Sequence, residues 1–324
     1  MSTAIIEIHD AGVRAGIDGE VAIESPGYAV LDGDRLLVGD EGIRNARLLP
    51  RWTNNRFWNQ LGTEPMPNGT ETLRHHADIA FAHLEQLWHQ VNGQADQVIL
   101  AVPGFYSRAQ LGLLLGMARE CNMPIGGIVD SALAAVSPSP AHRTILHLEI
   151  FLHRITLTLL QADSTLRFIE SVTISETGLF TLWDRWANII ASQFIQTSRY
   201  DPMHQAVSEQ ALYDALPGWI ESLGDERSQT FELNVGNSRH QVAVSREQLL
   251  GALSAIYPQI VQLVRDRLPG GEPASLFVSH RFQGFPGLSD SLGLIDNIEL
   301  VNLPTNSTFA GIIMHADKIV STGT

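Results

Sequence analysis

The pattern of apolar and polar positions predicts the same order of elements in the two halves of the chain. Each half opens with three strand-like apolar runs separated by short turns, and then continues as helix, strand, helix, strand and helix. The opening strands are predicted at residues 4–9, 13–17 and 21–31, and again at residues 144–149, 153–161 and 166–174. A repeated order of this kind favours a duplicated α/β unit, with mixed sheets flanked by helices.

The division of the chain follows from its length and from two prolines. A chain of 324 residues is long enough for two cores, because single cores usually stop growing at about 250–300 residues. Pro138 and Pro140 interrupt the pattern between the two repeats, so we predict one lobe at residues 1–140 and a second at residues 141–324. The second lobe is the longer one, and we expect an insertion in it at about residues 198–245.

Three long helices are predicted from apolar residues that recur at helical spacing. They cover about residues 71–91, 177–196 and 246–268. The last helix of the chain is predicted at residues 308–318.

Composition limits the kinds of partner. The formal net charge of -14 repels phosphate backbones and anionic lipid surfaces, so we expect neither nucleic acid nor a membrane as a partner. No apolar run reaches the ~18 residues that a membrane span needs, and the first residues do not follow the pattern of a signal peptide. The single cysteine, Cys121, fits a reducing compartment. These features together predict a cytoplasmic protein.

Four local stretches, in this order along the chain, resemble segments of the actin-like ATPase superfamily. They are PGYAVLDGDRLLVGDEG at residues 26–42, VILAVPGFYSRAQLGLLLGMARECNMPIGGIVDSALAA at 98–135, RYDPMHQAVSEQAL at 199–212 and PTNSTFAGII at 304–313. The similarity is greatest to the nucleotide-binding domain of the seventy-kilodalton heat-shock chaperones and to the bacterial cell-shape actins. The resemblance implies two duplicated ribonuclease-H-like lobes, an actin-like ATPase fold, with a cleft between the lobes where two glycine-bearing hairpin turns clasp the phosphates of ATP.

The two phosphate turns depart from the family pattern. The first turn reads IEIHDAGVRAG, which places His9 where the family has an aspartate, with Asp10 one residue later and Gly12 nearby. The second turn reads ILHLEIFLHRIT, and here His147 takes the place of the aspartate. Glu149 falls where the family has the first of its glycines, and it would repel a phosphate. We expect the apolar tip of this second turn, residues 151–152, to pack into the cleft between the lobes and hold them closed.

The other functional positions of the family are also altered. The adenosine-side loop corresponds to residues 278–286 and has lost its double glycine, although Gly284 follows shortly after. Asp130 stands where the chaperones carry a catalytic glutamate. The degenerate cleft positions that a nucleotide would meet are Gly12, Glu149, Ser279, His280 and Gly284.

These departures predict a pseudo-ATPase, a scaffold that binds an unidentified protein partner or small ligand, with no cofactor expected. The first alternative is a genuine Mg-ATP-binding protein with a remodelled clasp, in which Asp10 and Asp130 are the candidates for catalysis. The second alternative is a metal-dependent hydrolase, because His9 and His147 join several carboxylates in the predicted cleft, and such groups can hold zinc or manganese. Oligomers are compatible with each of the three hypotheses.

Overall fold

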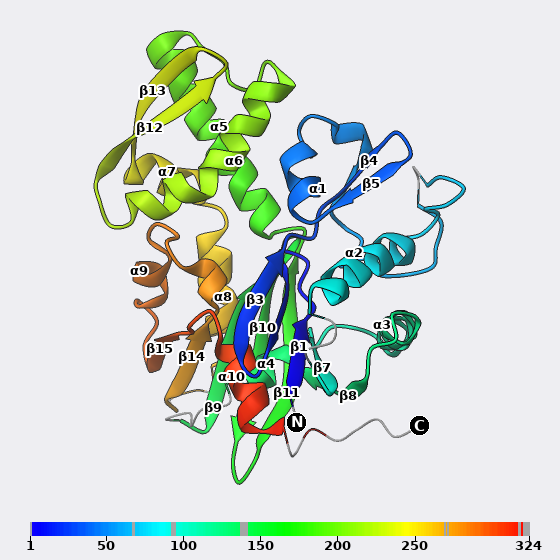
Figure 1. Ribbon diagram of the computed structural model, residues 1–324. Coiled ribbons are helices and arrows are strands. Elements are labelled where there is room, and N and C mark those ends of the chain that lie inside the picture. Colours follow the sequence, from blue (N-terminus) through cyan, green and yellow to red (C-terminus); the bar gives the residue numbers. More distant parts are fainter. Residues whose placement is uncertain are drawn as a thin grey trace.

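The computed structural model describes residues 2–66, 69–91, 95–136, 142–268, 270, 272–316 and 319 (Figure 1). Its first half contains a five-stranded sheet with the strand order β3-β2-β1-β7-β8. The strands are β1 (Thr3–Glu7), β2 (Val13–Ile17), β3 (Glu20–Ser25), β7 (Gln97–Val102) and β8 (Ile125–Asp130). β1, β2 and β3 pair antiparallel, whereas β7 is parallel to both β1 and β8.

The second half contains another five-stranded sheet with the corresponding order, β11-β10-β9-β14-β15. Its strands are β9 (Thr144–Ile150), β10 (Arg154–Ala162), β11 (Leu166–Ser175), β14 (Ala274–Val278) and β15 (Ile298–Asn302). The directions also correspond, because the first three strands pair antiparallel and the last two join in parallel. The predicted α/β class, with mixed sheets flanked by helices, is therefore confirmed.

The helices predicted at residues 71–91, 177–196 and 308–318 are present with different ends, and two helices that the pattern did not predict lie at residues 40–45 and 206–223. The helices are α1 (Asp40–Asn45), α2 (His76–Val91), α3 (Arg108–Glu120), α4 (Ser131–Ala135), α5 (Leu179–Ser198), α6 (Ala206–Leu223), α7 (Arg246–Ala252), α8 (Tyr257–Arg265), α9 (Leu288–Leu292) and α10 (Ser307–Met314). The single helix predicted over residues 246–268 is wrong. Pro258, which has no amide hydrogen to donate, lies in the first turn of α8, so the segment forms two helices.

Two further differences come from local turn chemistry. The predicted strand at residues 21–31 is divided at Pro26 into β3 and β4 (Ala29–Asp32), and β4 forms a small sheet with β5 (Arg35–Val38) and β6 (Thr53–Asn54). The insertion expected at about residues 198–245 contains α6 and a hairpin of β12 (Ser228–Val235) and β13 (Ser238–Ser245). This hairpin packs through its Phe231 ring, which stacks on Trp219 of α6 at 4.9 Å.

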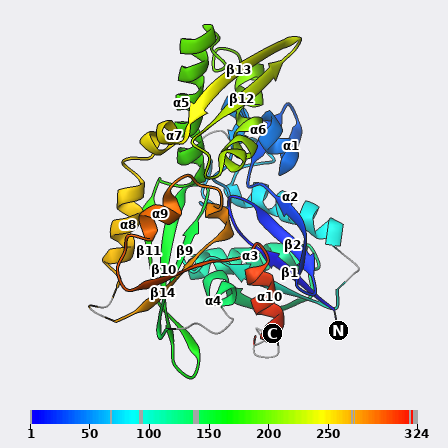
Figure 2. The same cartoon turned by 90° about the vertical axis from the view of Figure 1, so that its left-hand side faces the viewer.

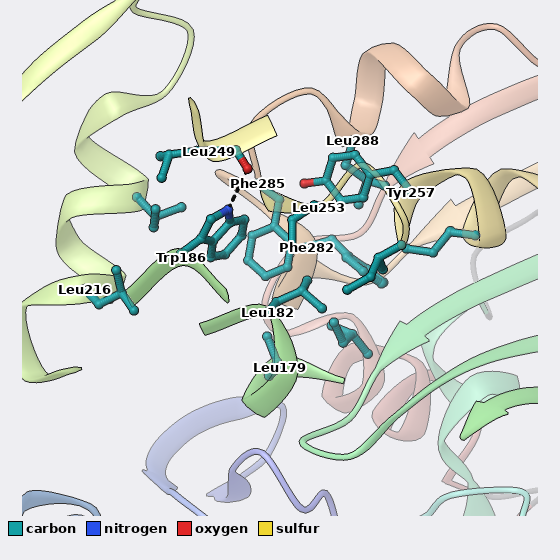
Figure 3. Close-up of a cluster of buried hydrophobic side chains, with 14 of the residues drawn as sticks. Leu179, Leu182, Trp186, Leu216, Leu249, Leu253, Tyr257, Phe282, Phe285 and Leu288 are labelled. Atoms are coloured by element: carbon teal, nitrogen blue, oxygen red, sulfur yellow. Dashed lines mark hydrogen bonds between the residues drawn. The ribbon is translucent and has the colours of Figure 1, made fainter. Parts of the chain in front are cut away.

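The core of the second half is centred on Trp186 of α5 (Figure 3). This side chain is fully buried, and its indole N–H donates a hydrogen bond to the Leu249 carbonyl at 3.1 Å. The ring of Phe285 meets the indole edge to face at 5.1 Å. Because Phe285 belongs to the loop after β14, this contact joins that loop to α5 of the same half.

The last helix packs against the sheet of the first half. Phe309 and Ile312 of α10 are buried together with Ile5 of β1 and Ile99 of β7. Figures 1 and 2 both show α10, in red, beside β1. Helix α10 thus packs against β1, the first strand of the chain. The predicted lobe boundary near Pro138 and Pro140 lies outside the described residues.

Among the described residues, no helix is long and apolar enough to cross a membrane.

A buried histidine of the first half makes stability depend on pH. His83 of α2 accepts a hydrogen bond from the indole N–H of Trp58 at 3.0 Å, and its other ring nitrogen lies 2.7 Å from Ser25 Oγ. Burial lowers the pKa of His83 from 6.5 to about 3. The unfolded chain therefore binds a proton at this residue below about pH 6.5, whereas the folded chain does so only near pH 3. The free energy of unfolding must fall as the pH drops through this range.

We expect His83 alone to remove about 2 kcal/mol of stability between pH 7 and pH 5. Urea unfolding at both pH values should show that the replacement His83→Gln reduces the wild-type loss by about this amount. His89, exposed on the same helix, is the matched control, and His89→Gln should leave the loss unchanged. Equal pH dependence in the two variants would contradict the assignment.

Candidate functional site

The first and second turns of the predicted clasp meet between the two large sheets. The first turn follows β1, and its Gly12 N–H donates to the His9 carbonyl at 3.1 Å. The second turn joins β9 to β10 and is closed by the Phe151 N–H, which donates to the Arg154 carbonyl at 2.8 Å. The turns are linked directly, because Asp10 Oδ1 accepts a hydrogen bond from the Leu152 N–H at 2.6 Å.

Aromatic rings fill the space beside this hydrogen bond. The Phe151 ring stacks on the His9 imidazole with a centroid separation of 4.1 Å and an angle of 10° between the planes. The Phe105 ring also contacts Phe151, edge to face, with a centroid separation of 5.0 Å. The Arg154 guanidinium lies 4.1 Å from the centre of the Phe105 ring. Phe151 and Leu152 are each only 3% exposed. The expected packing of the second tip between the two halves is therefore observed.

A network of buried charges lies behind the aromatic stack. Glu7 of β1 pairs with Arg14, its cross-strand partner on β2, through Arg14 Nε at 2.6 Å. Glu7 also accepts a hydrogen bond from the Thr308 hydroxyl at 3.1 Å, and Arg14 donates to the Thr305 carbonyl. These contacts connect β1 and β2 to the segment that leads into α10.

Arg281 extends this network from the second half to the first turn. One of its N–H groups donates to the Gly12 carbonyl at 3.3 Å, and its guanidinium lies 3.9 Å from both Glu7 and Glu149. His9 lies on the other side of Glu149. Its Nδ1 accepts a hydrogen bond from the Ala11 N–H at 3.2 Å, so its ring proton lies on Nε2, which is 3.7 Å from Glu149 Oε1. The backbone carbonyl of Gly12 and the carboxylate of Glu149 thus both face Arg281.

The charge network determines which groups are ionised. Burial alone raises the pKa of Glu7, but Arg14 and Arg281 outweigh burial and hold this pKa below its usual range. Burial acts in the same direction on Glu149, where His9 and Arg281 outweigh it and lower the pKa strongly. Both carboxylates are therefore negatively charged at neutral pH, inside a region from which water is largely excluded.

Two other candidate residues, His147 and Asp130, have surroundings different from those of the two turns. His147 of β9 is buried, and its ring nitrogens have no hydrogen-bond partner among the described residues; burial lowers its pKa. Asp130 does not join the contacting turns. Its carboxylate caps α4, where it accepts hydrogen bonds from the N–H groups of Ala132 at 2.9 Å and Leu133 at 3.0 Å.

The loop at residues 278–286, predicted to lie on the adenosine side of the cleft, is also occupied by its own contacts. Ser279 caps a short 3-10 helix (His280–Phe282) by accepting a hydrogen bond from the Arg281 N–H at 3.3 Å. Burial lowers the pKa of His280 to about 3, so this imidazole is neutral at pH 7. Gly284 has a positive φ of 75°, and a Cβ added there would lie 3.5 Å from Glu221 Cα of α6. The loop and α6 are therefore already in close contact at this glycine.

No three His, Cys, Asp or Glu side chains among the described residues are arranged to hold a metal ion. His9 lies near Asp10 and Glu149, but the Phe151 ring covers one face of its imidazole. The hypothesis of a metal-dependent hydrolase therefore finds no ligand set in this part of the chain.

Sequence reasoning missed the arginines that hold the site together. Glu7 and Arg14 had a usable signal, because an acid and a base opposite each other across a tight predicted hairpin can pair on one face. Arg281 had none beyond its position next to His280 in the altered loop. Its partners, Glu7 and Glu149, lie far from it in the sequence.

Comparison with known proteins adds no assignment: no protein-family model matches the chain, and no curated protein matches it.

Proposed function

We propose that the chain is a degenerate actin-like protein, built from two ribonuclease-H-like lobes, that does not hydrolyse ATP and acts as a scaffold for a protein partner or small ligand. The corresponding order and direction of strands in the two large sheets support the fold part of this proposal. The resemblance of four segments to the chaperone and cell-shape-actin domains supports it as well.

One observation carries the functional part: the two turns contact each other where a phosphate clasp would have to be open. The Leu152 N–H, a donor of the kind that holds phosphate oxygens, is already bound to Asp10. The Phe151 ring lies on His9, and the partly buried Glu149 adds negative charge beside them. A triphosphate would have to displace an aromatic stack and approach an ionised carboxylate, and both changes cost free energy.

The alternative of an ATP-binding protein with a remodelled clasp has less support. It would use Gly12, Asp10, Asp130 and Gly284. The Gly12 carbonyl accepts from Arg281, Asp10 accepts from Leu152, and the Asp130 carboxylate is used as a helix cap. Each of these three residues therefore already makes a contact that a bound nucleotide would have to replace.

Titration calorimetry tests the proposal. Purified protein titrated with millimolar Mg-ATP, and separately with ATP without metal and with Mg-ADP, should give no saturable heat. The free energy of unfolding, measured on the same sample, is the control that the protein is folded during the titration. Saturable heat that depends on Mg²⁺ would contradict the proposal and favour the remodelled clasp.

A further inference from the structure

A separate cavity of about 460 Å³ lies between the two halves, bordered by α1 from the first half and by α5 and α6 from the second. Figure 1 shows α1 and α6 side by side above the large sheets. The lining includes four aromatic rings and two arginines: Tyr28, Arg44, Arg47, Phe180, Trp183 and Tyr213. None of the lining residues belongs to the two contacting turns.

The walls of this cavity are held by specific hydrogen bonds between the halves. Gln210 of α6 accepts from the Arg47 N–H at 2.8 Å and donates to the Ile43 carbonyl at 3.0 Å. It also donates to Asp214, at 2.8 Å, so this lining carboxylate already has a partner. The Tyr213 hydroxyl donates to Asp184 at 2.7 Å, which fixes the ring. The cavity is thus formed before any ligand enters, as is usual for small-molecule sites of its size.

The two arginines differ in how their charges are balanced. Arg47 lies 3.6 Å from the centre of the Tyr213 ring, and its guanidinium pairs with Glu209 at 3.2 Å. Arg44 has no side-chain hydrogen bond or ion pair with any residue in the described part of the chain. The cavity therefore presents one unpaired guanidinium beside a set of aromatic rings.

We propose that this cavity binds a planar aromatic anion, with its ring against Phe180 and Trp183 and its anionic group on Arg44. Flat apolar rings favour stacking on aromatic side chains, and a guanidinium binds a carboxylate or sulfonate through two parallel N–H bonds. Asp40 also lines the cavity, one helical turn before Arg44. Its carboxylate would attract a cationic ligand, so the proposal predicts that the attraction of Arg44 for an anion outweighs it, and the probes below include a cation for this reason.

The inference goes beyond the proposed function and does not depend on it, because the cavity shares no residue with the turns that would hold phosphate. Its test uses neither nucleotide nor Mg²⁺, so its failure and a failure of the pseudo-ATPase proposal can be told apart.

The test compares three naphthalene probes of the same shape by titration calorimetry: naphthalene-2-sulfonate, naphthalene-2-methanol and naphthalene-2-methylamine. At moderate salt, which screens repulsion by the net charge of -14, the sulfonate should bind at one site about fivefold more tightly than the alcohol. The amine should bind most weakly.

Arg44→Ala should bring the sulfonate and the alcohol to within about twofold of each other. Arg108→Ala is the matched control, because Arg108 is also exposed but does not line this cavity, and it should leave the fivefold preference unchanged. Three results would each overturn the proposal: no saturable binding of the sulfonate, a preference for the amine, or a preference for the sulfonate that survives Arg44→Ala.

Discussion

Replacing Phe151 by alanine should lower the free energy of unfolding by about 3–5 kcal/mol. The ring is buried between His9 and Phe105, from the first half, although it belongs to the second. Its removal takes away both aromatic contacts and leaves a cavity at the junction, which the surrounding strands can fill only in part. Urea unfolding at pH 7, followed by tryptophan fluorescence, measures the change.

Phe168→Ala is the control for this prediction. Phe168 lies on β11 of the same half but is 40% exposed, so its loss should change stability by less than about 1 kcal/mol. A similarly small change for Phe151→Ala would mean that the stack contributes little to holding the halves together, and it would weaken the case for a filled clasp.

Replacing Arg14 by methionine should also cost about 3–5 kcal/mol, because Glu7 would remain buried without its main partner. The methionine keeps most of the apolar stem of the arginine, so the loss reports the missing charge rather than missing volume. The double variant Glu7→Gln, Arg14→Met should recover much of this stability, since no buried carboxylate is then left unpaired.

Low pH should remove the stabilisation that the Glu7–Arg14 pair contributes. The pKa of Glu7 is lower in the folded protein than in the unfolded chain, so its contribution is complete above the unfolded pKa and is lost as the pH falls through the folded pKa. The double variant, which has no carboxylate at this position, should lose less stability below about pH 4.5 than the wild type. A single variant Arg14→Met as stable as the wild type would show that the buried pair does not stabilise the fold.

The sequence pattern predicted the sheets better than the helices. The apolar runs located the three opening strands of each large sheet, because turn residues such as Gly19 and Asp163 separate them, although the run at residues 21–31 is divided at Pro26. The single helix over residues 246–268 was wrong because a proline is compatible with the first turn of a new helix, and the apolar period continued across the break. The packing of α10 on the first sheet, through Phe309, could not follow from local pattern.

The candidate site was predictable only in part. The altered turns could be located from the sequence, and their apolar tip at Phe151 indicated burial. The partners of these turns could not be found in the same way. Arg281 reaches Gly12 and Glu149 only because the fold brings the loop after β14 next to both turns, and no spacing in the sequence encodes that contact. Asp130 was assigned by resemblance alone, whereas its carboxylate is taken up by the two amides at the start of α4.

An experimental structure of the protein with saturating Mg-ADP tests the central claim most directly, because it shows what lies between the two turns. We expect the Phe151 ring still stacked on His9, the Leu152 N–H still bound to Asp10, and no diphosphate between them. A diphosphate held by the amides of the two turns, with Phe151 displaced from His9, would contradict the account.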